Sequence, residues 1–110
     1  MTAQGTAFGV VLSGVVGELV RVEADVADGL PGVTIVGLPD TSVSESRQRI
    51  KVAIERLDLA WPNRRLTIGL SPAELRKHGS GLDLPMAMAV LAATDQLGGA
   101  SLGSTAFIGE

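Results

Sequence analysis

The 110-residue sequence contains no cysteine, no tyrosine, one tryptophan and one histidine. Without cysteine the chain cannot form disulfides, and a single histidine cannot supply the three or four ligands of a zinc site. Aromatic residues make up only 3 % of the chain, so the core must consist mainly of aliphatic side chains and methionine. No apolar run reaches the roughly 18 residues of a membrane-spanning helix, and no signal peptide is recognisable. We therefore expect one domain, residues 1–110, in a cytoplasmic protein without membrane contact.

Charge is distributed unevenly along the chain, although the net charge is only −3. Residues 1–46 hold six acidic residues against one arginine, whereas residues 47–83 hold eight basic residues against four acidic ones. A basic middle third is typical of a solvated face, and it also fits a surface that faces an anion or an acidic partner.

The hydrophobic pattern predicts the element order β-β-β-α-β-α-β. Two strands joined by a turn at 13–17 form a hairpin, because apolar and polar residues alternate in GELVRVEADVADG. The segment VTIVG is β-branched and almost continuously apolar, which predicts a short buried strand. Strands grouped first and helices later favour an α+β fold, with a mixed sheet and helices packed on one face.

Two helices are expected, one after Asp40 and one after Asp83. In the first, Asp40, Thr41 and Ser42 are candidate N-caps. Ser42 and Glu45 fit a capping box, and Glu45 can pair with Arg49 one turn later. The second, PMAMAVLAATDQL, is apolar nearly all round, so it should be deeply buried with Asp83 as its cap. A last strand is expected in TAFIGE. Because the sequence stops there without a cap or a polar tail, we expect it to be a truncated domain of a longer chain.

The stretch GLPGVTIVGLPD holds Gly32 and Gly37 at the Gly-x-x-x-x-Gly spacing of a phosphate-binding loop. Such a loop continues with Lys and Ser or Thr, which reach the outer phosphates and the magnesium ion. Here Leu38 and Pro39 follow, and Pro39 has no amide hydrogen to donate. The stretch is therefore interpreted as a strand between two turns, without a nucleotide site.

Four basic residues flank the strand expected in RRLTIGLS, two at each end: Arg64, Arg65, Arg76 and Lys77. As DNA contacts they would bind phosphates, with an affinity that depends on salt and little on sequence. Alternatively they are solvated, compensate helix ends, or contact an acidic neighbouring domain. Trp61 is the one aromatic residue nearby, which does not support a base-stacking platform.

Four stretches in this order resemble the N-terminal domain of the magnesium-chelatase-like AAA+ ATPases of the ComM/YifB type: AFGVVLSGV, GLPGVTIVGLPDTSVSESRQRIKVAI, WPNRRLTIGLSPAELRKHGSGLDLPMAMAVLAA and FIGE. The elements Val-Gly-Leu-Pro, Glu-Ser-Arg-x-Arg and Asp-Leu-Pro are each weak alone, and their joint order makes the resemblance specific. It implies a fold similar to the second domain of ribosomal protein S-five and to the protease domain of Lon.

The resemblance also implies a function. ComM-type proteins are ATP-driven hexameric helicases that promote branch migration of DNA during recombination. This chain would be a non-catalytic accessory domain that helps the ring assemble or guides DNA, with Arg64, Arg65, Arg76 and Lys77 as its contacts. ATP and Mg²⁺ would bind in a motor domain outside this sequence. The implied partners are the rest of the ATPase chain, further copies in a ring, and DNA.

Two alternatives remain open. A Lon-like serine peptidase would place its nucleophile in GSGLD, but Gly81 occupies that position, Ser80 is one residue early, and the expected lysine base would lie beyond Glu110. A triad of Ser80, His78 and Asp83 would crowd into one short loop. The other alternative is a pure interaction module, in which cations of the first helix contact an acidic neighbouring subunit: Arg47, Arg49, Lys51 and Arg56.

Overall fold

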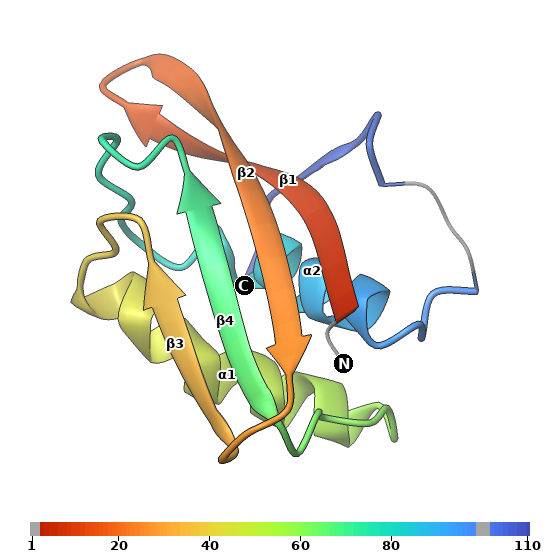
Figure 1. Cartoon of the computed structure of the whole chain (residues 1–110). Helices are drawn as coiled ribbons and strands as arrows, with labels where there is room; N and C mark the ends of the chain where they lie inside the picture. Colours follow the sequence, from red (N-terminus) through yellow and green to blue (C-terminus); the bar gives the residue numbers. More distant parts are fainter. Residues whose placement is uncertain (1–2, 99–101) are drawn as a thin grey trace.

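In the computed structural model, which describes residues 3–98 and 102–110, two helices cover one face of a five-stranded mixed sheet (Figure 1). The α+β class and the expected element order are therefore confirmed. The elements are β1 (Ala3–Ser13), β2 (Val16–Ala27), β3 (Gly32–Val36), α1 (Thr41–Arg56), β4 (Arg65–Ser71), α2 (Asp83–Ala93) and β5 (Ala106–Phe107). The specific likeness to ribosomal protein S-five stays a prediction.

The strand order in the sheet is β3-β4-β2-β1-β5. β1 and β2 form the expected antiparallel hairpin, which extends from the pair Ala3 and Val26 to the pair Ser13 and Val16. β4 runs antiparallel to β2 and parallel to β3. β5 adds a short parallel pairing to β1. Two strands that are distant in the sequence, β2 and β4, thus form the centre of the sheet.

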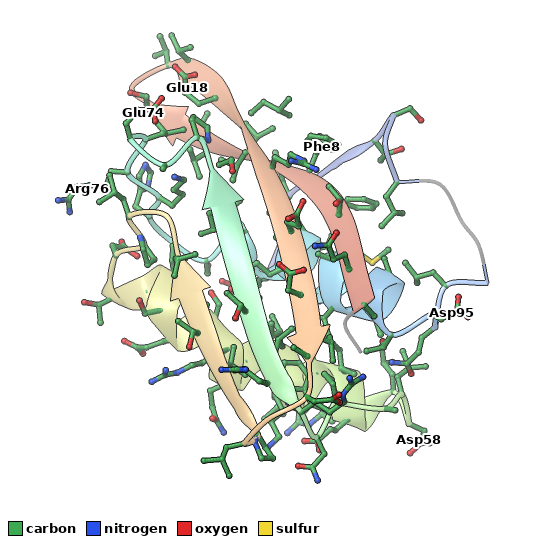
Figure 2. All side chains as sticks on the ribbon, viewed as in Figure 1. Phe8, Glu18, Asp58, Glu74, Arg76 and Asp95 are labelled. Carbon is green, nitrogen blue, oxygen red and sulfur yellow. The ribbon has the colours of Figure 1, made fainter. Side chains whose placement is uncertain are left out.

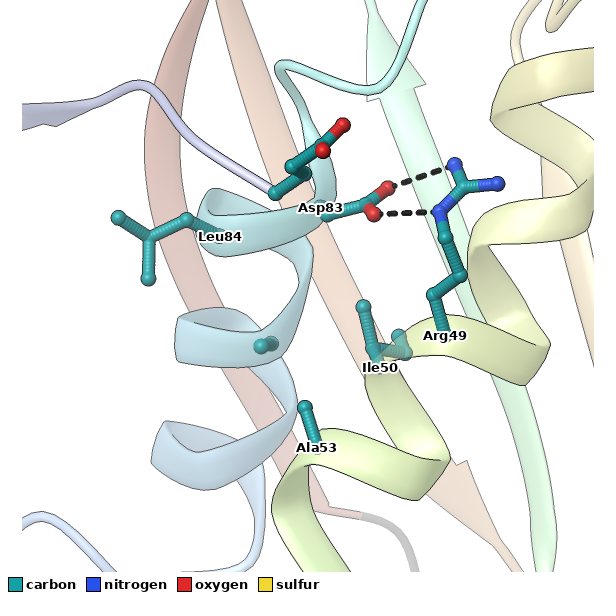
Figure 3. Close-up of a pocket in the computed structure, with 7 residues that line it drawn as sticks. Arg49, Ile50, Ala53, Asp83 and Leu84 are labelled. Atoms are coloured by element: carbon teal, nitrogen blue, oxygen red, sulfur yellow. Dashed lines mark hydrogen bonds and ion pairs between the residues drawn. The ribbon is translucent and has the colours of Figure 1, made fainter.

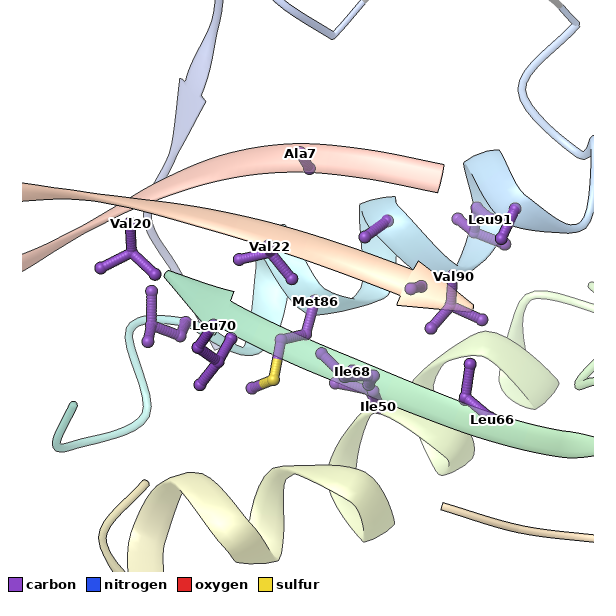
Figure 4. Packing of buried hydrophobic residues seen from close by; sticks show 14 of the residues in the cluster. Ala7, Val20, Val22, Ile50, Leu66, Ile68, Leu70, Met86, Val90 and Leu91 are labelled. Carbon is purple, nitrogen blue, oxygen red and sulfur yellow. The ribbon is translucent and has the colours of Figure 1, made fainter. Parts of the chain in front are cut away.

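The core lies between the sheet and the helices (Figure 4). In β2 the alternation predicted from the sequence is present, because Val20 and Val22 are buried whereas Leu19 and Arg21 are exposed. Aliphatic side chains of β1, β4, α1 and α2 complete this cluster. The deep burial expected for the second helix is confirmed along most of α2, including Met86 and Val90.

The expectation of a buried strand in VTIVG is wrong. β3 is an edge strand with one neighbour, β4. Val33 and Ile35 are half-buried on its inner face, while Thr34 and Val36 are exposed. A strand that is covered on one face only has to alternate in burial, however apolar its sequence is.

The turn after β3 depends on Gly37. Its φ is +112°, and a Cβ atom built there would lie 2.1 Å from the carbonyl oxygen of Leu70. Only glycine fits both this backbone angle and this close approach. The stretch GLPGVTIVGLPD therefore forms a strand followed by a tight turn, as the interpretation without a phosphate loop requires.

The helix caps agree only in part with the expected ones. Asp40 caps α1, since its carboxylate accepts a hydrogen bond of 2.8 Å from the amide of Val43. Ser42 already lies within the helix, so it is not the N-cap. The N-cap position of α2 is Leu82, which has no capping side chain, while Asp83 begins the helix and uses its carboxylate elsewhere. Within the described residues, neither helix is long and apolar enough to cross a membrane.

Candidate functional site

The four basic residues singled out in the sequence lie at opposite ends of β4. Arg64 and Arg65 stand at its start, whereas Arg76 and Lys77 follow its end. A strand of this length separates the two pairs by on the order of 20 Å. Figure 2 shows Arg76 at the end of the sheet where β4 finishes, on the same side as Glu74. The structure therefore does not bring the four together into one patch.

Arg64 and Arg65 both lie beside Asp28, in the turn between β2 and β3. Arg64 Nη2 donates to Asp28 Oδ1 at 2.8 Å, and Arg65 Nη2 lies 3.4 Å from the carbonyl oxygen of Asp28. Arg65 is exposed and Arg64 half-buried. A phosphate that binds here would compete with Asp28 for Arg64, so Arg65 is the more available cation.

Lys77 is fully buried, in contrast to the other three. Its backbone bridges to the turn after β3, where its amide donates to Leu38 and its carbonyl accepts from Asp40. The ammonium donates to the carbonyl oxygen of Pro72, and burial lowers the pKa of Lys77. With this bridge the side chain lies inside the molecule. Lys77 is therefore not among the surface cations that are available to bind DNA phosphates.

Arg49 forms an ion pair with Asp83 and not with Glu45, its expected partner (Figure 3). Its Nε donates to Asp83 Oδ2 at 2.6 Å and its Nη2 to Asp83 Oδ1 at 3.0 Å. The buried Ser46 hydroxyl donates to the same carboxylate at 2.5 Å. The hydrogen bonds from Arg49 to the Asp83 carboxylate raise the pKa of Arg49. The Glu-Ser-Arg-x-Arg and Asp-Leu-Pro elements of the sequence thus meet, and they fasten α1 to α2.

A groove of about 370 Å³ lies beside this ion pair, between α1 and α2 (Figure 3). Its apolar lining comes from both helices, and its charged groups are already engaged with one another or with Ser80. The lining residues are Arg49, Ile50, Ala53, Asp83, Leu84, Ala87 and Glu110. The groove is therefore better suited to apolar contact than to acid–base chemistry.

The structure does not assemble the peptidase residues considered from the sequence. Ser80 Oγ donates to the carboxylate of Glu110, while His78 Nε2 donates to the carbonyl oxygen of Leu12 at 2.8 Å. Asp83 faces Arg49 on α1. Within residues 3–98 and 102–110, no group of three or more metal-ligating side chains occurs.

A second pocket, of about 320 Å³, lies between α1 and the start of β3. Sequence reasoning missed it, because its walls come from three separate segments. Arg47 and Lys51 lie one helical turn apart, which was a usable signal, but nothing in the sequence placed Trp61 beside them. The lining residues are Pro31, Gly32, Val33, Arg47, Gln48, Lys51, Trp61, Pro62 and Asn63.

Comparison with known proteins shows which family this fold and these motifs represent. Residues 22–110 match the family model described as subunit ChlI of Mg-chelatase. The chain belongs to this family. Its relatives place it with the ComM/YifB type: it is 40 % identical to competence protein ComM of Haemophilus influenzae over 88 % of its length, and 44 % identical to the uncharacterized protein YifB of Escherichia coli over 83 %.

An uncharacterized protein of Mycobacterium tuberculosis is 46 % identical over 98 % of this chain. The chain covers 22 % of that protein, 18 % of YifB and 19 % of ComM. It thus spans about a fifth of the length of the curated relatives that it matches.

Proposed function

We propose that this chain is the non-catalytic accessory domain of a ComM-type AAA+ ATPase that acts on DNA in the cytoplasm. The observation that carries the proposal is its 40 % identity to a competence protein over 88 % of the chain. The family is of the AAA+ ATPase type, so ATP and Mg²⁺ would bind in a motor outside these 110 residues. The complete protein would form a hexameric ring and drive branch migration.

The arrangement of the polar side chains supports a domain that takes part in binding or assembly and does not catalyse a reaction. The carboxylate of Asp83 holds two helices together, and His78 and Ser80 are hydrogen-bonded to the backbone of β1 and to Glu110. Assembly of the ring is supported by the apolar groove between α1 and α2, next to which Val52 and Leu57 are exposed.

The proposed DNA contacts are Arg64, Arg65 and Arg76, which would bind phosphates. We expect the 110-residue chain to bind single-stranded and forked DNA, and replacing all three arginines with alanine should weaken this binding. Because each lost phosphate contact removes about one unit from the salt slope of the affinity, the variant should also depend less on salt. Fluorescence anisotropy of a labelled strand at several salt concentrations measures both effects.

Lys77→Met provides the control for this experiment. It removes a cation that the surface does not present, so DNA affinity should stay within about twofold of the wild type. If the chain binds no DNA, or if the arginine variant binds as tightly and with the same salt slope as the wild type, the proposed contacts are wrong.

A further inference from the structure

The pocket between α1 and β3 gathers hydrogen-bond donors that the fold does not use. Among the residues that the structure describes, Arg47 and Lys51 form neither ion pairs nor side-chain hydrogen bonds, and the same holds for the side chains of Gln48, Asn63 and Trp61. All five line the pocket, and no carboxylate does. The pocket therefore offers positive charge and free donors in one place, which is the chemistry that binds an anion.

Arg47 and Lys51 occupy one side of α1, one turn apart. Like charges at this spacing repel each other, so their placement costs the helix some stability unless an anion lies between them. Both side chains are exposed. Figure 1 shows α1 crossing behind β3. Gly32 and Val33 of β3, with Pro31 directly before the strand, also line the pocket.

Trp61 forms the aromatic wall, and its position is fixed from two sides. The half-buried indole packs against the hydrophobic core. The residue before it, Ala60, is held at both backbone groups by the side-chain amide of Gln96, with two hydrogen bonds of 2.8 Å. Gln96 is held in turn by a hydrogen bond to Thr94. An aromatic ring that is held in place before binding loses little entropy when a ligand stacks on it.

We propose that this pocket binds one nucleotide unit of single-stranded nucleic acid. Arg47 and Lys51 hold its phosphate, Trp61 stacks on its base, and Gln48 and Asn63 donate to its polar edge. The volume of about 320 Å³ lies in the range of small-ligand sites, and stacking on one aromatic ring tolerates any base. The inference rests on the proposed DNA function and deepens it, because it places a base contact on α1 and the segment after it.

Nucleic acid fits these residues better than an acidic protein segment does. A carboxylate side chain would satisfy the two cations, but it would leave the indole without a stacking partner. The sequence alone did not support stacking, since it contains a single tryptophan. The structure changes this argument because it places that one ring beside two unpaired cations.

Trp61 makes the test direct, because it is the only tryptophan and the chain has no tyrosine. We expect a short oligothymidylate to quench the intrinsic fluorescence of the 110-residue chain. Arg47→Ala and Lys51→Ala should each weaken binding roughly tenfold at low salt and lower the salt slope by about one. In anisotropy with a labelled strand, Trp61→Leu should weaken binding roughly fivefold or more, whereas Trp61→Phe retains part of the affinity.

Arg56→Ala is the matched control, since it removes an exposed cation from the same helix outside the pocket. It should change the affinity less than about twofold if the contact is local. An equal loss in Arg56→Ala, tighter quenching by poly-glutamate than by oligothymidylate, or the absence of any quenching by oligothymidylate would each overturn the inference.

The outcome also separates this inference from the proposed function. If the labelled strand binds and only the Arg64, Arg65 and Arg76 variant loses affinity, while Trp61 emission stays unchanged, the pocket is refuted and the DNA function stands. If no strand binds under any condition, both fail. Quenching that requires Arg47 and Lys51 supports the pocket, whatever the other three arginines contribute.

Discussion

The side chain of Lys77 has no role on the protein surface. It is fully buried, and its one hydrogen bond is to the carbonyl oxygen of Pro72. Burial disfavours the charged ammonium, so the pKa of Lys77 is lowered from its ordinary value of 10.5. Between the lowered pKa and 10.5 the unfolded chain binds more protons than the folded one, and folding stability therefore rises with pH in that window.

We expect Lys77→Met to raise the free energy of unfolding at neutral pH by about 1 kcal/mol, because it replaces a buried charge with an apolar side chain of similar length. Pro72 keeps a hydrogen bond, since its carbonyl also accepts from the amide of Leu75. The advantage of the variant should shrink as the pH rises toward 10.5. Urea unfolding over a pH series measures this, and a variant that is less stable at every pH would contradict it.

At the scale of elements, the ion pair between Arg49 and Asp83 joins α1 to α2. Arg49→Ala leaves the carboxylate of Asp83 buried with only the hydroxyl of Ser46, and should lower the free energy of unfolding by about 3 kcal/mol. Asp83→Ala should cost less, because the Arg49 side chain is 38 % exposed and water can solvate it. Glu45→Ala is the control and should change stability by less than about 0.5 kcal/mol. Equal effects of all three would refute a specific pair.

The packing of β1 against α2 depends on a glycine at position 5. A Cβ atom at Gly5 would lie 2.3 Å from both the carbonyl oxygen of Ala89 and the amide nitrogen of Ala93. Since backbone cannot move aside as a side chain does, Gly5→Ala should destabilise the fold by about 3 kcal/mol. Gly32→Ala is the matched control, because a Cβ there meets no atom within 4 Å. Thermal unfolding compares the two, and a harmless Gly5→Ala would show that β1 and α2 can separate.

For the whole molecule, local patterns predicted the elements and the β1–β2 hairpin, but not the pairing of strands that are distant in the sequence. The alternation in β2 and the apolar character of α2 gave the correct type and order of the elements, because both follow from nearby residues. The edge position of β3 depends on which strand pairs with it, and only the tertiary structure determines that. An apolar strand at an edge and one at the centre of a sheet can look alike in sequence.

The same limit applies to the candidate site. Arg64 and Arg76 are correctly placed beside the ends of a strand, but whether such cations form one patch depends on the length and direction of that strand. The pocket required Arg47 of α1 and Trp61 of the segment after that helix to line one cavity. The burial of Lys77 accompanies a backbone bridge to the segment after β3. These are contacts between segments, which a periodic pattern does not contain.

The position of β4 between β2 and β3 has a consequence for how the chain is made. Both neighbours of β4 precede it in the sequence, and β3 pairs with no other strand. During synthesis the β1–β2 hairpin can close early, whereas β3 has no strand partner until residues 65–71 have left the ribosome, and α1 lacks its helix partner until residues 83–93 have followed. One late strand then completes both halves of the sheet, so the nascent domain exposes an unpaired β3 until β4 has emerged, and the apolar side of α1 until α2 has emerged.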